Sequence, residues 1–348
     1  MTHATPAPHV TIFGAGSFGT ALAISLANHE QPVTLYARRE EHVEQMRTTR
    51  RNPRYLKTAS MPTSIRLTSD LEEAARAATM WVFCTPAQTV RQVAGEVAHL
   101  ATSEHIVYSA AKGIETGTHL RPSEVLEAAL PNVPKARLGV LFGPSHAEEV
   151  AQGQPTALVA SGYDMECVRR VQATFMAPTL RVYSNSDVVG VEVGGCVKNI
   201  LAIAAGMSDG MGGGDNAKAA LVTRGIAEIR RLGMALGARP MTFGGLTGIG
   251  DLVVTCMSSH SRNRYVGEQI GRGRSLQDIL DEMQMVAEGV PTTESVHEWA
   301  HELGVEMPLV SAVYHILFEA KHPQQALIEL MTRQARHEEE LSDVLGAC

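Results

Sequence analysis

A lysine inside an apolar stretch is the first residue of this sequence that points to chemistry. Residues 191–207 read VEVGGCVKNILAIAAGM, and Lys198 follows Gly194 and Gly195 at helical spacing. In a helix the lysine would stand on a stripe of very small residues. A separate apolar stripe is formed by Cys196, Ile200, Ile203 and Met207. A desolvated ammonium is costly unless a function requires it, so we single out Lys198 as a candidate functional residue. The alternative is a side chain that only covers the helix.

A glycine-rich loop near the N-terminus is typical of dinucleotide binding. FGAGSFGTAL follows a predicted strand and opens a predicted helix, and its Gly14, Gly16 and Gly19 have the G-x-G-x-x-G spacing. Gly14 allows a tight turn, Gly16 lets a pyrophosphate approach the backbone, and Gly19 allows close helix–strand packing. The helix N-terminus then faces the phosphates. An ordinary strand–helix turn is the alternative.

The end of the second predicted strand indicates which dinucleotide is bound. An NAD site usually has an acidic residue here, which accepts the ribose hydroxyls. The sequence LYARRE offers Arg38 and Arg39 instead, and a guanidinium suits the 2′-phosphate of NADP. We therefore predict that NADP(H) is preferred and that NAD(H) is possible. The alternative is a solvated start of the charged helix RREEHVEQM.

The stretch HEWAHELG has the H-E-x-x-H spacing of zinc proteases, with His297, Glu298 and His301. A third histidine is missing, since Met307 stands three residues after Gly304. The apolar face of a helix here would be formed by Val296, Trp299, Ala300 and Leu303, which leaves both histidines at its edges. We therefore predict a surface helix here and no metal site.

These candidate residues lie in two halves with different hydrophobic patterns. Up to about residue 185, eight short apolar runs alternate with helical segments, which predicts parallel βαβ units in a Rossmann-like fold. The predicted strands are 9–13, 32–36, 64–68, 80–84, 105–111, 138–142, 156–161 and 180–184. From about residue 188 only helical patterns follow, in segments that include 216–237, 276–283, 292–304 and 309–320. We expect Gly237 to end the first of these segments.

The fold class is therefore α/β followed by all-α. We expect a dinucleotide-binding domain over residues 1–187, a helical substrate and dimerisation domain over 188–336, and a charged tail over 337–348. A chain of 348 residues favours two domains over one.

The composition excludes several classes of protein. A net charge of −7 argues against nucleic acid or an anionic membrane as the partner. We expect no secretory signal and no membrane insertion, because the N-terminus lacks a basic and an apolar region and no apolar run looks long enough to span a bilayer. The five cysteines form no CxxC pair, which predicts free thiols in a reducing cytoplasm.

Six motifs, taken together, resemble the NAD(P)-dependent glycerol-3-phosphate dehydrogenases of bacterial type. The resemblance runs in order from about residue 9 to about residue 330, which makes it far more specific than any single motif. The motifs are GAGSFGTA, SAAKGIE, GPSHAEEV, VKNILAIAAGM, GIGDLVVTCMSSHSRNRYVG and VAEGVPTTESV.

The resemblance implies a cytoplasmic, usually homodimeric enzyme that interconverts dihydroxyacetone phosphate and sn-glycerol 3-phosphate and supplies glycerophospholipid synthesis. It assigns catalysis to Lys198, Lys112 and Asp251. It implies a substrate site that comprises Lys112, Gly143, Ser145, Lys198, Asp251, Ser261, Arg262 and Asn263. Beyond the three loop glycines, it implies cofactor contacts from Ser17, Phe18, Arg38, Lys112, Ala147, Arg262, Val286 and Glu288, with Tyr55 as a further candidate.

The chemistry of these residue types agrees with that reaction. Hydride addition to a carbonyl leaves an alkoxide that needs a proton, and desolvation beside a second cation, Lys112, lowers the pKa of Lys198 toward neutrality. Asp251 can accept from an ammonium and fix its direction. Ser261, Arg262 and Asn263 precede a helical stretch, where three donors suit a phosphate dianion; a simple helix cap with an exposed arginine is the alternative.

Two other functions fit parts of the sequence. A hydroxyacid reductase would use the same cofactor fold but needs a carboxylate site in place of a phosphate site. A non-catalytic NADP-binding sensor would keep the glycine loop and have no use for Lys198, Lys112 and Asp251.

Overall fold

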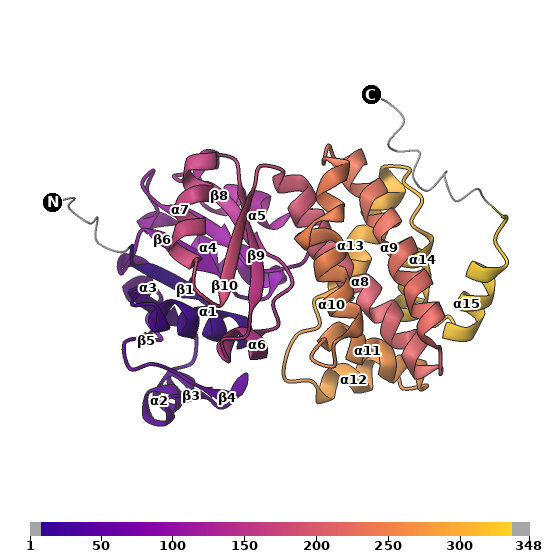
Figure 1. The fold of residues 1–348 in the computed structure, drawn as a ribbon, viewed down its shortest axis with the longest axis horizontal. Coiled ribbons are helices and arrows are strands. Elements are labelled where there is room, and N and C mark those ends of the chain that lie inside the picture. Colours follow the sequence, from indigo (N-terminus) through magenta and orange to yellow (C-terminus); the bar gives the residue numbers. More distant parts are fainter. Residues whose placement is uncertain (1–7, 336–348) are drawn as a thin grey trace. The chain divides into compact units, whose positions relative to one another are not determined.

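A computed structural model describes residues 8–335 of the chain, so the predicted tail at 337–348 lies outside the described residues. Contacts between residues divide the chain into two compact units (Figure 1). An α/β unit holds the chain up to Ala111 and from Pro122 to Val188, and a helical unit holds Lys112–Arg121 and the chain from Val189. Nothing in the composition of residues 112–121 indicates that this segment belongs with the helices.

The α/β unit is built on one eight-stranded sheet, in the order β10-β9-β8-β7-β6-β1-β2-β5. Each strand overlaps one of the eight predicted runs, which confirms those predictions. The strands are β1 (Val10–Phe13), β2 (Val33–Tyr36), β5 (Arg66–Thr68), β6 (Met80–Phe83), β7 (Ile106–Ser109), β8 (Leu138–Phe142), β9 (Thr156–Gly162) and β10 (Leu180–Asn185). The central strands are buried on both faces, which explains their uninterrupted β-branched and aromatic sequences.

The sheet is parallel except where β8 pairs with β9 in the antiparallel direction, so the prediction of parallel units throughout was wrong at that pair. A parallel connection needs a crossover that runs back along the sheet. Residues 143–155 provide only α6 (Ala147–Ala151), which spans roughly 8 Å at 1.5 Å per residue. The chain therefore enters β9 from the edge at which β8 ends.

A small second sheet was not predicted. It pairs β3 (Arg51–Asn52) with β4 (Leu56–Ser60) in the antiparallel direction. Its sequence, RNPRYLKTAS, is polar and contains a proline, so it carries little of the alternation that marks a strand. Helices of the α/β unit cover the main sheet; they are α1 (Ser17–Asn28), α2 (Glu40–Thr49), α3 (Leu71–Arg76), α4 (Val90–Val97), α5 (Pro122–Ala129) and α7 (Met165–Phe175).

The helical unit confirms the all-helical prediction for the second half of the described chain. Its α-helices are α8 (Val188–Gly210), α9 (Asp215–Ala235), α10 (Asp251–Met257), α11 (Arg262–Gly271), α12 (Leu276–Glu282), α13 (Gly289–Glu302), α14 (Pro308–Phe318) and α15 (Pro323–Met331). Helix α9 ends as predicted, with Gly237 in the left-handed conformation at φ +88° just after the helix cap.

Helix α8 forms the centre of this unit. By length and composition it could span a membrane, with a mean hydropathy of 1.6 over its most apolar window, so the expectation that no apolar run reaches that length was wrong. However, 89% of that window is buried inside the protein, which is typical of a core helix. Helix α11 crosses α8 very closely, because a Cβ on Gly206 would lie 1.9 Å from the Arg264 carbonyl oxygen.

Candidate active site

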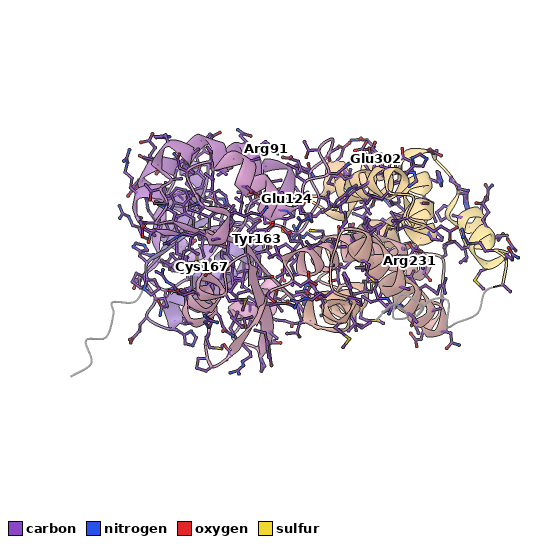
Figure 2. All side chains as sticks on the ribbon, turned by 90° about the horizontal axis from the view of Figure 1, so that it is seen from above. Arg91, Glu124, Tyr163, Cys167, Arg231 and Glu302 are labelled. Atoms are coloured by element: carbon purple, nitrogen blue, oxygen red, sulfur yellow. The ribbon has the colours of Figure 1, made fainter. Side chains whose placement is uncertain are left out.

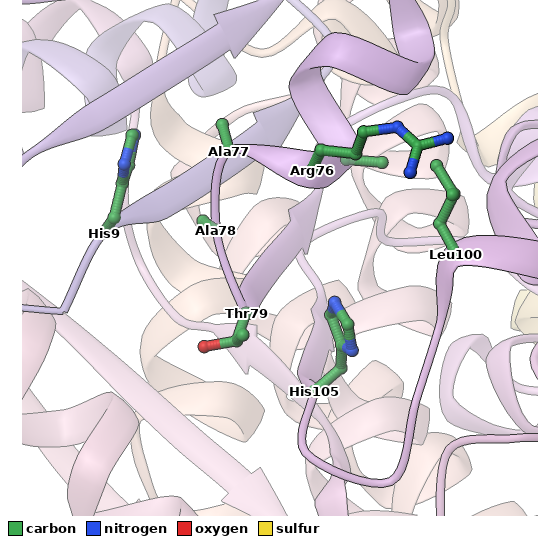
Figure 3. Close-up of a pocket in the computed structure, with 8 residues that line it drawn as sticks. His9, Arg76, Ala77, Ala78, Thr79, Leu100 and His105 are labelled. Atoms are coloured by element: carbon green, nitrogen blue, oxygen red, sulfur yellow. The ribbon is translucent and has the colours of Figure 1, made fainter.

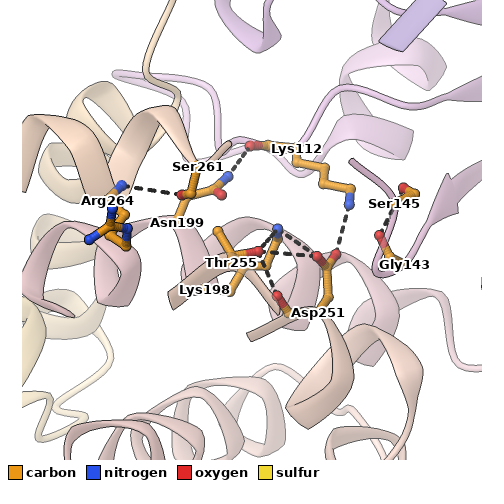
Figure 4. Close-up of polar contacts among 9 residues, drawn as sticks. All are labelled: Lys112, Gly143, Ser145, Lys198, Asn199, Asp251, Thr255, Ser261 and Arg264. Atoms are coloured by element: carbon orange, nitrogen blue, oxygen red, sulfur yellow. Dashed lines mark hydrogen bonds and ion pairs between the residues drawn. The ribbon is translucent and has the colours of Figure 1, made fainter. Parts of the chain in front are cut away.

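A buried group of two lysines and one aspartate lies inside the helical unit (Figure 4). The Asp251 carboxylate contacts Lys198 Nζ through Oδ1 at 2.6 Å and Lys112 Nζ through Oδ2 at 2.7 Å. The side chains of Lys198 and Asp251 are 6% and 2% exposed, and that of Lys112 is 16% exposed. The structure therefore brings together the three residues predicted to carry catalysis.

Close packing of α8 against a neighbouring turn places Asp251 beside Lys198. The π-helical turn Leu246–Gly250 leads directly into α10, whose first residue is Asp251. A Cβ on Gly194 would lie 2.5 Å from the Thr247 carbonyl oxygen. One of the small residues near Lys198 is therefore needed for the approach of the turn that carries the aspartate.

The charges in this group shift the proton affinities of Lys198 and Asp251. The pKa of Lys198 is lowered from an ordinary value of 10.5 to about 8, mainly by burial; Asp251 opposes this shift, and the Lys112 ammonium contributes to it. Burial alone would raise the pKa of Asp251, but the two ammoniums hold it below its usual value. At neutral pH the group therefore contains one carboxylate and a lysine able to exchange a proton.

A threonine that was not predicted orients Lys198. Lys198 Nζ donates to Thr255 Oγ1 at 2.6 Å, and the same hydroxyl donates to the Asp251 carbonyl oxygen at 2.6 Å. Thr255 follows Asp251 by one helical turn on α10 and is buried. A hydroxyl four residues after the predicted aspartate was the only signal in the sequence.

The predicted phosphate residues lie together at the start of α11. Ser261 caps this helix, since its Oγ accepts from the Arg264 backbone N–H at 3.2 Å. The Asn263 amide oxygen accepts from the Gly289 N–H at 2.9 Å, and the partly exposed Arg262 donates to the Val286 carbonyl at 2.9 Å. The cap that was weighed as the alternative is therefore present, and Ser261 serves it.

Two predicted cofactor residues lie close to these bonds. The Val286 carbonyl accepts from the Arg262 guanidinium, and Glu288 immediately precedes α13. Arg264, which was not predicted, holds the loop before α11 by donating to the Ser258 carbonyl at 3.0 Å and to Asp209 at 2.6 Å.

The glycine loop of the α/β unit has the geometry of a phosphate cradle. Gly14 has φ +114°, and a Cβ there would lie 2.9 Å from the Cys84 carbonyl group. A Cβ on Gly16 would meet no described atom within 4 Å, so the space beside this residue is open. Gly16 is also the first residue before α1, whose N-terminus has no side-chain cap, and Ser17 and Phe18 form the first turn with Gly19. The uncapped amides of the first α1 turn therefore fit a dinucleotide pyrophosphate.

A buried asparagine that was not predicted supports this loop from the small sheet. Asn52 donates to the Ala15 carbonyl at 2.9 Å and to Thr20 Oγ1 at 2.8 Å, and its own oxygen accepts from the Tyr55 backbone N–H at 3.0 Å. Tyr55, a cofactor candidate, thus lies in the hairpin that is tied to the glycine loop. Its ring packs near His42, at 5.5 Å between centroids.

Arg38 and Arg39 follow the carboxyl end of β2, and both are exposed. Arg39 is also the cap residue of α2, as expected if this segment begins a solvated helix. Gly143 and Ser145 follow β8, where Gly143 has φ +135° and the Ser145 hydroxyl donates to the Gly143 carbonyl at 3.0 Å. Ala147 opens α6. All of these residues lie at the carboxyl ends of strands, where open α/β sheets bind ligands.

A pocket at the amino ends of the strands of the same sheet does not match the predicted cofactor site (Figure 3). Among its lining residues are His9, Thr79 and His105, which precede β1, β6 and β7. The glycine loop follows the carboxyl end of β1, so the pocket and the loop lie at opposite ends of that strand.

The H-E-x-x-H stretch forms part of α13. The His297 ring stacks on Tyr314 at 3.9 Å between centroids, whereas Glu298 lies 3.2 Å from the ring of His119. Within residues 8–335, no group of three or more histidine, cysteine, aspartate or glutamate side chains could hold a metal ion. The described cysteines Cys84, Cys167, Cys196 and Cys256 are free.

Comparison with known proteins agrees with both units. Residues 9–168 match the family described as NAD-dependent glycerol-3-phosphate dehydrogenase N-terminus, and residues 187–328 match its C-terminus. A glycerol-3-phosphate dehydrogenase (NAD(P)+) of Salinibacter ruber is 57% identical over 94% of this chain and 96% of its own. One from Chlorobium luteolum is 51% identical over 95% of this chain and 99% of its own.

A crystal structure of glycerol-3-phosphate dehydrogenase from Coxiella burnetii has the same fold. It is 37% identical and has a TM-score of 0.89, covering 94% of this chain and 99% of that one. Both halves of the sequence, the fold and the relatives agree: the chain belongs to the NAD-dependent glycerol-3-phosphate dehydrogenase family.

Proposed function

We propose that this protein catalyses the reversible, NAD(P)H-dependent reduction of dihydroxyacetone phosphate to sn-glycerol 3-phosphate, with Lys198 as the general acid and base. The observation that carries the proposal is the buried contact of Lys198 and Lys112 with one carboxylate, at 2.6 and 2.7 Å. Both ammoniums are largely buried, at 6% and 16% exposed, and two desolvated cations beside one carboxylate are costly for a purely structural contact. The second ammonium lowers the pKa of Lys198 and provides positive charge for a carbonyl oxygen.

The residues of the α/β unit suit the cofactor. Gly14, Gly16 and Gly19 form the cradle, and the uncapped N-terminus of α1 provides backbone donors for a pyrophosphate. When bound, the nicotinamide cofactor supplies or accepts the hydride. The chain itself contributes binding, orientation and the proton.

Proton transfer falls to Lys198. In the direction of reduction its ammonium gives a proton to the oxygen that becomes the C2 hydroxyl, and in oxidation the neutral amine takes that proton back. Thr255 and Asp251 each accept from Lys198 Nζ, both at 2.6 Å, and so fix the direction of the remaining proton. Lys112 stabilises negative charge on the same oxygen.

The start of α11 is the proposed phosphate site. Arg262 is partly exposed and adjoins a helix N-terminus, and Asn263 lies beside it. A guanidinium and helix amides together suit a dianion. Ser261 acts mainly as the cap that shapes this terminus, since its hydroxyl already accepts from the Arg264 N–H.

Further parts of the proposal follow from the family resemblance. We expect NADP(H) to be preferred through Arg38, a cytoplasmic location, a homodimer and a role in glycerophospholipid synthesis. The free thiols support a reducing compartment. Light scattering of the purified protein tests the dimer directly.

One set of assays tests the reaction. The purified protein is mixed with NADPH and with dihydroxyacetone phosphate, and consumption of NADPH is followed together with formation of glycerol 3-phosphate. The same assay with 2-oxoacids tests a hydroxyacid reductase, and Lys198→Ala is the control for contaminating activity. Turnover of 2-oxoacids but not of the phosphate ester would refute the proposed substrate, and binding of NADPH without any turnover would indicate a sensor.

A further inference from the structure

The segment Lys112–Arg121 has a tertiary role that its sequence does not suggest. In sequence it lies between two stretches of the α/β unit, yet its contacts assign it to the helical unit. It begins with Lys112 and ends with Arg121, and both of these side chains reach carboxylates of the helical unit. We call residues 112–121 the strap.

The strap is held at its beginning by backbone contacts as well as by Lys112 itself. The Asn199 amide donates to the Lys112 carbonyl at 2.9 Å (Figure 4), and Asn199 adjoins Lys198 on α8. Two residues further, the Ser295 hydroxyl of α13 lies 3.4 Å from the Ile114 carbonyl, and it shares its single hydrogen with a nearer carbonyl of its own helix at 3.2 Å. The backbone that carries Lys112 is thus bonded to α8 and in contact with α13.

The other end of the strap is held by a buried ion pair. Arg121 contacts Glu192 of α8, and their side chains are 9% and 0% exposed. Glu192 lies on the helix that also carries Lys198. A charge pair this deeply buried is costly to break, because the remaining partner would be left uncompensated.

Between these two ends, His119 is held by a pair of acidic residues on α13. Its Nε2 lies 3.2 Å from Glu298 and its Nδ1 lies 3.5 Å from Glu302; Figure 2 labels Glu302 on this helix. His119 has a left-handed φ of +55°, so the strap backbone turns sharply at this residue. Glu298 comes from the H-E-x-x-H stretch, and this contact gives that motif a role that involves no metal.

The strap is also folded on itself. The Glu115 N–H donates to the Leu120 carbonyl at 3.1 Å, and the Thr118 hydroxyl donates to the Glu115 carboxylate at 2.6 Å. These bonds close residues 115–120 into one local unit, which lies between Lys112 and the anchor at Arg121. Its anchors at His119 and Arg121 therefore bear on the position of Lys112.

We propose that the strap is a positioning device for Lys112, in which Arg121–Glu192 and His119–Glu298 act as positioning residues for the reaction. The proposal rests on the catalytic role of Lys112 proposed above. Loss of an anchor lets the strap backbone move, so that the Lys112 ammonium no longer stays at Asp251 and at the substrate oxygen.

Double-mutant cycles in the full-length protein test this inference. The strap variants are His119→Asn, which retains a residue type tolerant of positive φ, and the paired replacement Arg121→Met with Glu192→Met. Each is measured alone and combined with Lys112→Ala, as kcat/KM for dihydroxyacetone phosphate. His315→Asn is the matched control, because His315 pairs with Glu319 at 2.7 Å on α14 and does not touch the strap.

We expect each strap variant to lower kcat/KM about ten-fold in the parent and less than two-fold when Lys112 is already alanine, since coupled residues are not additive. His315→Asn should have little effect in either background. The same loss in both backgrounds, or no loss in the parent, would overturn the inference. If the buried double replacement does not fold, His119→Asn decides the question by the same criteria.

The cycle also separates this inference from the proposed function. Lys112→Ala with parental activity would refute the proposed role of Lys112 itself. A large loss in Lys112→Ala with fully additive strap variants would refute only the positioning role of the strap.

Discussion

The hydroxyl of Thr255 links the side chain of Lys198 to the backbone of Asp251. It accepts from Lys198 Nζ and donates to the Asp251 carbonyl, both at 2.6 Å. Because its one hydrogen goes to the carbonyl, this hydroxyl can only accept from the lysine. Two oxygens from the same helix turn, of Thr255 and of Asp251, thus fix the direction of the Lys198 ammonium.

Replacement of Lys198 should remove catalysis without removing the cofactor. We expect Lys198→Ala to lower kcat by about 10²–10⁴, the usual scale for a general acid, while the NADPH dissociation constant changes little. Lys198→Arg should fail as well, because a guanidinium is too basic to exchange a proton near neutral pH. Steady-state kinetics and NADPH titration measure the two effects, and near-normal turnover in the alanine variant would exclude this assignment.

The two directions of the reaction should depend on pH in opposite ways. Reduction needs the Lys198 ammonium, whose pKa burial lowers to about 8, so kcat/KM for dihydroxyacetone phosphate should fall as the pH rises through about 8. Oxidation needs the neutral amine, and kcat/KM for glycerol 3-phosphate should rise over the same range. Parallel profiles in both directions would show that Lys198 is not the group that titrates.

Arg262 should read the phosphate of the substrate. A hydrogen bond to a charged group contributes about 1.5–3 kcal/mol, so Arg262→Ala should lower kcat/KM for dihydroxyacetone phosphate by roughly ten- to a hundred-fold or more. Dihydroxyacetone, which lacks the phosphate, should be reduced equally poorly by the variant and the parent. An equal loss for both compounds would mean that Arg262 does not anchor the phosphate.

Arg38 should set the cofactor preference. The exposed guanidinium after β2 would attract the 2′-phosphate, so the parent should favour NADPH and Arg38→Asp should reverse the ratio of kcat/KM for the two cofactors. Arg39→Asp provides a comparison at the helix cap. Equal use of both cofactors by the parent would show that Arg38 does not read the phosphate.

Glu228 should make stability depend on pH. Its carboxylate accepts from the Leu309 and Val310 N–H groups at 2.8 and 3.2 Å, and burial raises its pKa from 4.5 to about 7. Because the folded protein binds this proton more tightly than the unfolded chain does, the protonated Glu228 stabilises the fold fully when the pH is below 4.5, the pKa in the unfolded chain. This stabilisation is lost as the pH rises through about 7, the pKa in the folded protein. Denaturant unfolding of the parent and of Glu228→Gln should therefore show their difference in unfolding free energy fall by about 3 kcal/mol between pH 4.5 and 8. A difference that stays constant would contradict the shift.

The fold could be predicted from the sequence where one local pattern determines the structure. Uninterrupted apolar runs identified the eight strands, and Gly237 marked the end of α9 because its φ of +88° suits glycine. The reversal at β9 was not predictable in this way, because strand direction depends on how far α6 can carry the chain. The small sheet was missed because its sequence lacks alternation.

The candidate site shows the same division. Lys198 was noticeable because it interrupts an apolar helix, and Lys112 and Asp251 came from the family motifs. Glu192 interrupts the same helix, with a side chain that is 0% exposed, but its partner lies far away in the sequence. Pairings of this kind depend on tertiary contacts that spacing in one sequence does not contain.

The strap also affects how this protein could be recombined. The chain passes between the two units at Ala111–Lys112, at Arg121–Pro122 and at Val188–Val189, so the helical unit is not one continuous piece of sequence. A chimera joined only near residue 188 would combine the strap of one parent with the helices of the other, and would separate Arg121 from the Glu192 that it contacts in this chain. Exchange of the whole helical unit between relatives therefore requires two junctions in addition to the one near residue 188, one on each side of the strap.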